Sequence, residues 1–138
     1  MLSNKARGDL YEIQIRDYII RELHKPAYLW HETPETILLE HGIIGSHNEH
    51  CLRRKTRRDE PNPLVDTGVD VIQVNDDSCS LVQCKNGYGK KGITYADLTG
   101  FMMWLCALEQ TTGVVYYTSR LSTNIRELPP NKRLQFVR

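Results

Sequence analysis

Apolar and polar positions along the chain follow two different periods. Between residues 9 and 24, Tyr11, Ile15 and Ile19 recur at helical spacing and Pro26 follows, so this segment predicts a helix. Short apolar runs predict strands over 27–32, 36–40, 69–75, 79–86 and 113–119, and an edge strand over 134–138; a second helix is expected over about 95–109. Helix, strands, helix and strand in this order indicate an α/β or α+β protein with helices packed on a central mixed sheet.

Three polar residues interrupt the two best strand patterns. They are Asp70 in the first, and Gln83 and Lys85 in the second, and the intervening "NDDS" is a turn signal. A hairpin with a two-residue loop would set Asp70 opposite Gln83, and one with a four-residue loop would set it opposite Lys85. Both registers place the three side chains on one face, and a slip by one residue would separate them.

An acid, an amide and an ammonium group are costly to bury without partners, and a divalent cation is a natural partner for them. Mg²⁺ prefers oxygen ligands, which Asp70, the Gln83 amide and the Cys84 backbone carbonyl could supply. Glu12 falls on the inward stripe of the first helix and could complete the site. Lys85 would then bind a phosphate or help to deprotonate water, so the residues predict metal-assisted phosphodiester hydrolysis. The simpler interpretation is a cross-strand ion pair between Asp70 and Lys85, with Glu12 at the fringe of its helix.

Length and charge refine this hypothesis. At 138 residues the chain fits a single domain, residues 1–138, and its net charge is only +1. Positive charge is nevertheless concentrated in two places, which favours a polyanionic partner such as DNA. The residues are Arg53, Arg54, Lys55, Arg57 and Arg58, within a long basic loop or insertion over about 41–65, and Lys90 and Lys91 beside Lys85. A solvated loop is the alternative interpretation of the first cluster.

Other chemistry is less strongly indicated. The four cysteines form no CxxC pair, and no stretch resembles a signal peptide or a membrane span, so we expect an intracellular protein with no membrane partner. His41, His47, His50 and Cys51 would suit zinc, but no second paired cluster closes such a site. The helix expected over 95–109 is apolar almost all round, which indicates core packing, with a homodimer face as the alternative.

The motifs resemble a known family. Asp70, Gln83-x-Lys85, a helix and the strand "GVVYYTS" resemble the PD-(D/E)XK nuclease superfamily. "GDLYE", "DTGVDVI" and "LVQCKN" are similar to its Mrr-type branch, in which glutamine replaces the first acid of the ExK motif, and the similarity runs from Gly8 to about Ser119. The resemblance implies a restriction endonuclease-like fold with an αβββαβ core and a DNA endonuclease that uses Mg²⁺ or Mn²⁺.

The resemblance also implies residue roles. Asp70 would be the principal metal ligand, Gln83 would take the place of an acid, and Lys85 would be the catalytic lysine. Glu12 would be the helix-borne carboxylate and Asp66 a secondary acidic position. Gln83 removes one negative charge from the site, and the segment 41–65 has no counterpart in the family pattern.

Two further resemblances widen the functional hypotheses. "VQCKNGY" and "LTGFMMW" are similar to nuclease-like domains fused to helicases of large DNA viruses. That similarity implies a helicase partner and a viral or host DNA-replication compartment. Beside the endonuclease, the sequence is compatible with a non-cleaving nucleic-acid-binding module of the same fold and with a dimeric Holliday junction resolvase.

Overall fold

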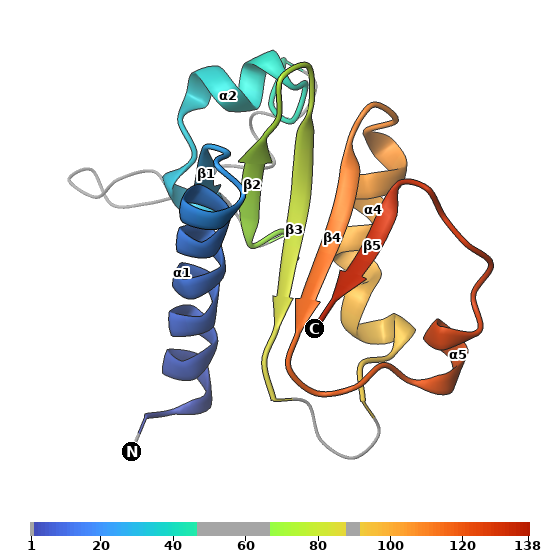
Figure 1. Ribbon diagram of the computed structural model, residues 1–138. Helices are drawn as coiled ribbons and strands as arrows, with labels where there is room; N and C mark the ends of the chain where they lie inside the picture. Colours follow the sequence, from blue (N-terminus) through green and yellow to red (C-terminus); the bar gives the residue numbers. More distant parts are fainter. Residues whose placement is uncertain (1, 47–66, 88–91) are drawn as a thin grey trace.

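The computed structural model describes residues 2–46, 67–87 and 92–138, and these residues build a mixed sheet. Its strands lie side by side in chain order: β1 (Ala27–Leu29), β2 (Val71–Val74), β3 (Cys79–Lys85), β4 (Thr112–Tyr117) and β5 (Leu134–Val137). β2 runs antiparallel to both of its neighbours, whereas β3, β4 and β5 run parallel (Figure 1). The predicted α/β class with a central mixed sheet is confirmed, and the last predicted strand lies at a sheet edge.

The first helix, α1 (Asn4–Glu22), begins earlier than its apolar pattern predicted. Ser3 supplies the N-cap, because its hydroxyl oxygen accepts a hydrogen bond from the Ala6 backbone N–H at 3.1 Å. A polar N-cap lies outside the apolar pattern and therefore could not be located by periodicity. The helix ends where His24 adopts a left-handed φ of 55° ahead of Pro26.

Two predicted strands were wrong in whole or in part. Residues 36–40 belong to a helix, α2 (Glu35–Glu40), and only the first half of the predicted strand 27–32 is β1; Trp30–Glu32 forms the 3₁₀ turn η1. The Pro34 carbonyl accepts hydrogen bonds from the N–H groups of Ile37 and Leu38, which starts the helical turn. An apolar run this short fits a strand or a helix equally well, so local pattern cannot separate the two.

The second predicted helix divides into two parts. Tyr95–Leu98 form the 3₁₀ turn η2, and Thr99–Ala107 form α4, so Leu108 and Glu109 lie beyond the helical end. A capping box between Thr94 and Asp97 starts the turn, with the Asp97 carboxylate accepting from the Thr94 N–H at 2.8 Å. A short helix, α5 (Thr123–Arg126), follows β4 and was not predicted.

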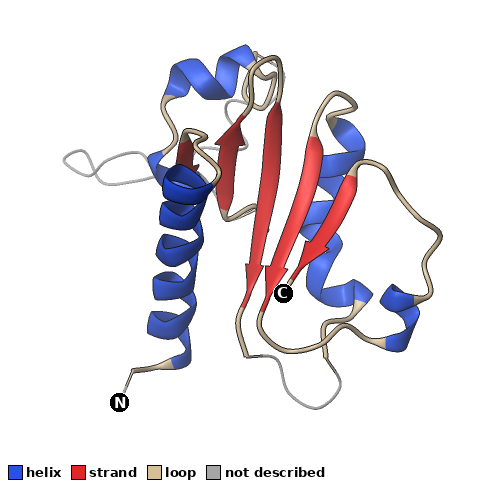
Figure 2. Ribbon diagram, in the orientation of Figure 1, coloured by secondary structure: helices blue, strands red, loops and turns tan. Residues whose placement is uncertain are grey.

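The two long helices cover opposite faces of the sheet (Figure 2). Along β3 the side chains alternate between the two faces, with Leu81 in the core beneath α4 and Val82 in the core beneath α1. Gly113 lets α4 approach closely, because a Cβ at this position would lie 2.9 Å from Cζ of Phe101. Both faces of β3 are therefore buried along most of its length.

The start of the predicted loop 41–65 is part of the core. Residues 41–46 form turns and bends, and Ile43 and Ile44 within them are buried among the residues packed on the α4 side. Residues 47–66 lie outside the described ranges. Among the helices that the structure describes, none combines the length and the apolar character needed to span a membrane.

Candidate active site at the open end of the hairpin

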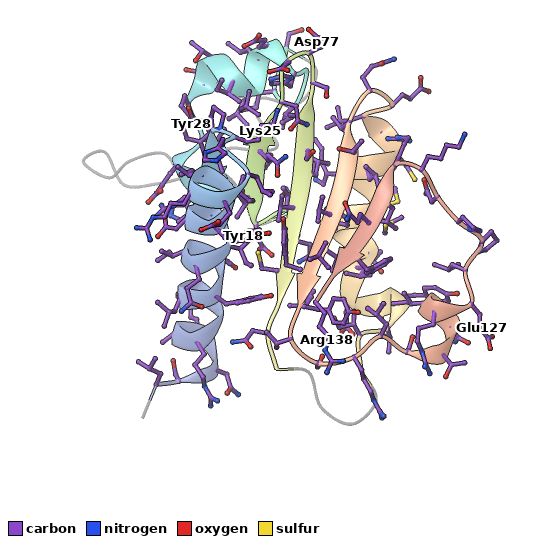
Figure 3. The ribbon with its side chains drawn as sticks, in the orientation of Figure 1. Tyr18, Lys25, Tyr28, Asp77, Glu127 and Arg138 are labelled. Carbon is purple, nitrogen blue, oxygen red and sulfur yellow. The ribbon has the colours of Figure 1, made fainter. Side chains whose placement is uncertain are left out.

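The candidate residues lie where β2 begins and β3 continues beyond it. Val71 pairs with Val82 and Val74 pairs with Cys79, and Asn75 donates its N–H to the Ser78 carbonyl at 2.8 Å. The connecting loop is therefore the two residues 76 and 77, which was the first of the two expected registers. Figure 3 labels Asp77 in this turn, at the end of the sheet opposite the carboxyl end of β5, where Arg138 lies.

Asp70 lies at the point where regular pairing of β2 with β3 stops. Its N–H donates to the Val82 carbonyl at 2.8 Å, although Val82 is already the register partner of Val71. Its own carbonyl accepts from the Trp30 N–H at 2.9 Å. A departure of this kind, as in a β-bulge, turns a side chain away from its regular direction.

Beyond the last β2–β3 pair, the Asp70 side chain and not the β2 backbone accepts the hydrogen bond from β3. Its Oδ2 accepts the backbone N–H of Cys84 at 2.7 Å, a short charge-assisted bond. In a strand the N–H and C=O of one residue point to the same side, so the Cys84 carbonyl faces the same flank of β3. Asp70 is therefore held through its backbone by Trp30 of η1 and through its carboxylate by Cys84 of β3.

Gln83 lies directly beside this carboxylate. Its Nε2 donates to Oδ2 of Asp70 at 3.3 Å, and the side chain is only 5% exposed. Its Oε1 is buried and has no hydrogen-bond partner among the described residues. A buried amide oxygen without a partner costs free energy, as do the buried hydroxyls of Thr67 and Ser119, which also lack a hydrogen-bond partner among the described residues.

The candidate residues reach this flank from both faces of the sheet. Gln83 and Lys85 share the α4 face by alternation with Leu81, whereas Cys84 packs against the α1-side core. Lys85 is partly buried at the end of β3, opposite Tyr117 of β4. The expected common face therefore holds for the two β3 side chains, while Glu12 belongs to the helix on the other face.

The Cys84 thiol lies within electrostatic range of the predicted charged residues. Burial raises its pKa well above the usual value; the Asp70 carboxylate and then the Glu12 carboxylate raise it further, and the Lys85 ammonium lowers it. All three charges predicted for the site thus act on one sulfur atom. The sequence interpretation used only the backbone carbonyl of Cys84 and missed its side chain, although its position between Gln83 and Lys85 placed it at the same strand end.

Two tyrosines border the thiol on the α1 side. Burial, followed by the nearby Cys84 and Tyr116, raises the pKa of Tyr11 to about 12. The pKa of Tyr116 is also raised, first by burial and then by Tyr18 and Cys84, and its ring packs edge-on against Tyr18 at 6.1 Å. Both phenols stay protonated near neutral pH, so they offer hydrogen-bond donors and no charge.

The donor atoms at this flank fit a hard divalent cation in chemical type. Asp70 offers a carboxylate, Gln83 an unsatisfied amide oxygen and Cys84 a backbone carbonyl, and these are oxygen ligands of the kind Mg²⁺ prefers. Gln83 turns its Nε2 toward Asp70, so its amide would have to rotate for both residues to share a cation. Within the described ranges, no three His, Cys, Asp or Glu side chains are grouped so that they could hold a metal ion.

Several predicted residues cannot be placed. Asp66, Lys90, Lys91 and the cluster Arg53, Arg54, Lys55, Arg57 and Arg58 lie outside the described residues, as do His47, His50 and Cys51 of the zinc hypothesis. His41 is partly buried, and its Nε2 has no hydrogen-bond partner among the described residues. The structure therefore describes the strand and helix residues of the predicted site but not its basic segments.

No family model matches the chain, and comparisons with curated proteins and with solved structures find no match either.

Proposed function

We propose that the chain is a nuclease that hydrolyses phosphodiester bonds of DNA with the help of Mg²⁺ or Mn²⁺. The observation that supports this most is the pairing of Asp70 with the incompletely satisfied Gln83 at the open end of the hairpin. The order α1, β1, β2, β3, α4, β4 agrees with the αβββαβ core of the restriction endonuclease-like fold. On this proposal the chain belongs to the Mrr-type branch of the PD-(D/E)XK superfamily.

In the proposed reaction, Asp70, the Gln83 amide oxygen and the Cys84 carbonyl would hold the cation. Glu12, whose charge acts on the same thiol as that of Asp70, would add negative charge from the α1 side. A divalent cation supplies charge neutralisation to a phosphodiester and makes a nearby water more acidic.

Lys85 would bind the phosphate that is to be cleaved. From the end of β3, two residues after Gln83, its ammonium group would contact an incoming phosphate and could orient the attacking water. Asp70 is positioned before any substrate binds, because the Cys84 N–H fixes its carboxylate. Such preorganisation reduces the rearrangement needed during the reaction.

The test is cleavage of supercoiled plasmid with Mg²⁺ or Mn²⁺ and with a chelator. We expect Lys85→Ala to reduce the rate by about 10²-fold or more and Asp70→Asn to reduce it to background. Asp76→Asn, in the turn at the other end of the same hairpin, and Lys132→Ala, before the start of β5, should cut like the unchanged protein. Equal cleavage by all of the variants would contradict the proposed site.

A non-cleaving DNA-binding module is the second candidate. It is favoured by the replacement of an acid by Gln83 and by the absence of a group of three metal-binding side chains among the described residues. DNA binding without cleavage in either cation would select this candidate. A dimeric junction resolvase would instead show cation-dependent cutting with a preference for four-way junctions over linear duplex.

A further inference from the structure

Helix α1 carries a second apolar stripe on the side that faces away from the sheet. Ala6, Ile13 and Ile20 follow one another at intervals of seven residues, so they lie on one line of the helix, flanked by Leu10. Leu10 and Ile20 are each 44% exposed, and Ile13 is 36% exposed. The residues that pack on the sheet, Ile15 and Ile19, point in a different direction and are buried.

A helix with apolar residues on two faces is typical of a helix covered on both sides. Here α1 contacts β1, β2 and β3 through one face, and Figure 1 shows its other face on the outside of the described residues. More than half of the large apolar side chains that the described residues leave exposed belong to α1 or to its two flanking residues Leu2 and Leu23. Leu10, Ile13 and Ile20 of the stripe are therefore a candidate interaction surface.

We infer that this stripe binds the same stripe of a second copy of the chain, with the two α1 helices antiparallel. A two-fold axis at Ile13 would place this residue against its own counterpart. Ala6 and Ile20 are both seven residues from Ile13, so each small Ala6 side chain would face a large Ile20 side chain of the other copy. An isologous contact of this type closes on itself and gives a dimer.

The charges along one flank of the stripe fit the antiparallel arrangement. Asp9 lies four residues before Ile13 and Arg16 lies three residues after it, so each Asp9 would approach an Arg16 of the other copy. Arg16 already contacts Asp17 and Glu32 at 3.2 Å within its own chain, and a guanidinium group with five N–H donors can serve a further acceptor. A parallel pair would place Ala6 against Ala6 and Ile20 against Ile20, and it would not bring Asp9 near Arg16 of the other copy.

The contact is expected to be reversible. α1 has 19 residues and is therefore roughly 28 Å long, which limits the area that one helix pair can bury. Stable interfaces bury about 1,200 Å² or more in total, so a dissociation constant in the micromolar range is expected. The inference does not depend on the proposed hydrolysis, because none of the stripe residues belongs to the proposed site.

The first test is sedimentation equilibrium over a concentration series up to about 100 μM. The unchanged chain should dimerise, and Ile13→Glu, which would put two carboxylates at the axis, should weaken the dimer by at least tenfold. Leu39→Glu, on α2 and exposed to 52%, is the matched control and should dimerise like the unchanged chain. Circular dichroism should show all three folded, because both substituted side chains are exposed.

The second test reports the direction of the helices. In a Cys106→Ser background, which removes an exposed thiol, Ile13→Cys should form a disulfide with its own counterpart on oxidation. Ala6→Cys and Ile20→Cys should crosslink when mixed but not when each is oxidised alone, as peptide mapping by mass spectrometry would show. A monomeric unchanged chain, a dimer that survives Ile13→Glu, or crosslinks of Ala6→Cys with itself would each overturn the inference.

Discussion

The two ends of the β2–β3 hairpin differ in how they satisfy buried polar side chains. At the turn end, Gln73 Nε2 donates to Asn75 Oδ1 at 2.9 Å, and Asn75 Nδ2 donates to Ser80 Oγ at 3.0 Å. The Ser80 hydroxyl shares a further hydrogen bond of 2.7 Å with the Thr112 hydroxyl. This chain of bonds joins β2, β3 and β4 and uses only groups that the fold itself provides.

At the open end, the buried side-chain amide of Gln83 is only partly hydrogen-bonded. Gln83 is as deeply buried as Ser80, but it makes one long hydrogen bond to Asp70, and its Oε1 has no partner among the described residues. The same strand thus carries a satisfied polar network at its start and an unsatisfied one near its end. Unsatisfied buried groups are costly, and they persist where a ligand or a reaction needs them.

The sharpest way to test this difference is to introduce an acid at the open end. Gln83→Glu would place a second carboxylate beside Asp70, so we expect Mg²⁺ to bind about tenfold more tightly, as measured by calorimetry. In the absence of the cation the same variant should melt at a lower temperature than the unchanged protein, because the two carboxylates repel each other. Asp77→Asn, at the turn end, should change neither quantity.

A Gln83→Glu variant whose cation affinity does not rise would contradict the assignment of this flank as a cation site. The opposite charge change offers an internal check, since Asp70→Asn should abolish the cation-dependent rise in melting temperature that ligand binding produces in the unchanged protein. Both variants alter groups beside Cys84, so their folding should first be verified by circular dichroism.

The second prediction compares stability at the two ends. Ser80→Ala should lower the free energy of unfolding by about 1–2 kcal/mol, because it leaves the Asn75 amide and the Thr112 hydroxyl without their partner. Gln83→Met keeps a similar volume and removes the unsatisfied oxygen, so it should change stability by less than about 1 kcal/mol in either direction. Urea unfolding with unchanged m-values would provide both numbers. A larger loss of stability for Gln83→Met than for Ser80→Ala would show that the polar groups at the open end stabilise the fold more than those at the turn end.

The third prediction uses the cysteines at the two ends of β3. Burial alone raises the pKa of Cys79 to about 11, whereas the pKa of Cys84 is raised by burial together with Asp70 and Glu12. Asp70→Asn should therefore speed the alkylation of Cys84 at a given pH and leave Cys79 unchanged, with the exposed Cys106 as a fast reference. Peptide-resolved mass spectrometry would separate the thiols. An equal effect on Cys79 and Cys84 would indicate loosening of the fold and not a local charge effect.

The raised pKa values of these thiols also make the stability of the fold depend on pH. A thiol with a raised pKa keeps its proton in the folded state at a pH where the unfolded chain has lost it, so stability is complete below the unfolded value of about 9 and falls as the pH rises above it. The raised pKa of Tyr11, to about 12, extends the loss to higher pH. Thermal melts between pH 7.5 and 10.5 should show this decline, and Cys84→Ala should reduce it.

Features that depend on local pattern were predictable from the sequence. The alternation along the two strands and the "NDDS" turn were compatible with two face-sharing registers, and the observed one, in which Val71 pairs with Val82 across a two-residue loop, is among them. Alternation also placed Gln83 and Lys85 on one face, and helical spacing located α1 and the buried Ile15 and Ile19. These features need only neighbours along the chain or across one hairpin, because side-chain direction is set by the backbone period.

Features that depend on where distant segments end or meet were decided by the tertiary structure alone. The apolar run 36–40 is a helix, and Ile43 and Ile44 lie in the protein core although the segment around them is mostly polar. The Asp70 carboxylate accepts the Cys84 N–H because β2 begins only at the residue after Asp70. The charge of Glu12 acts on the Cys84 thiol because α1 packs on that face of the sheet. Hydrogen-bond satisfaction and electrostatic proximity depend on three-dimensional distances, and periodicity along a chain carries no information about those distances.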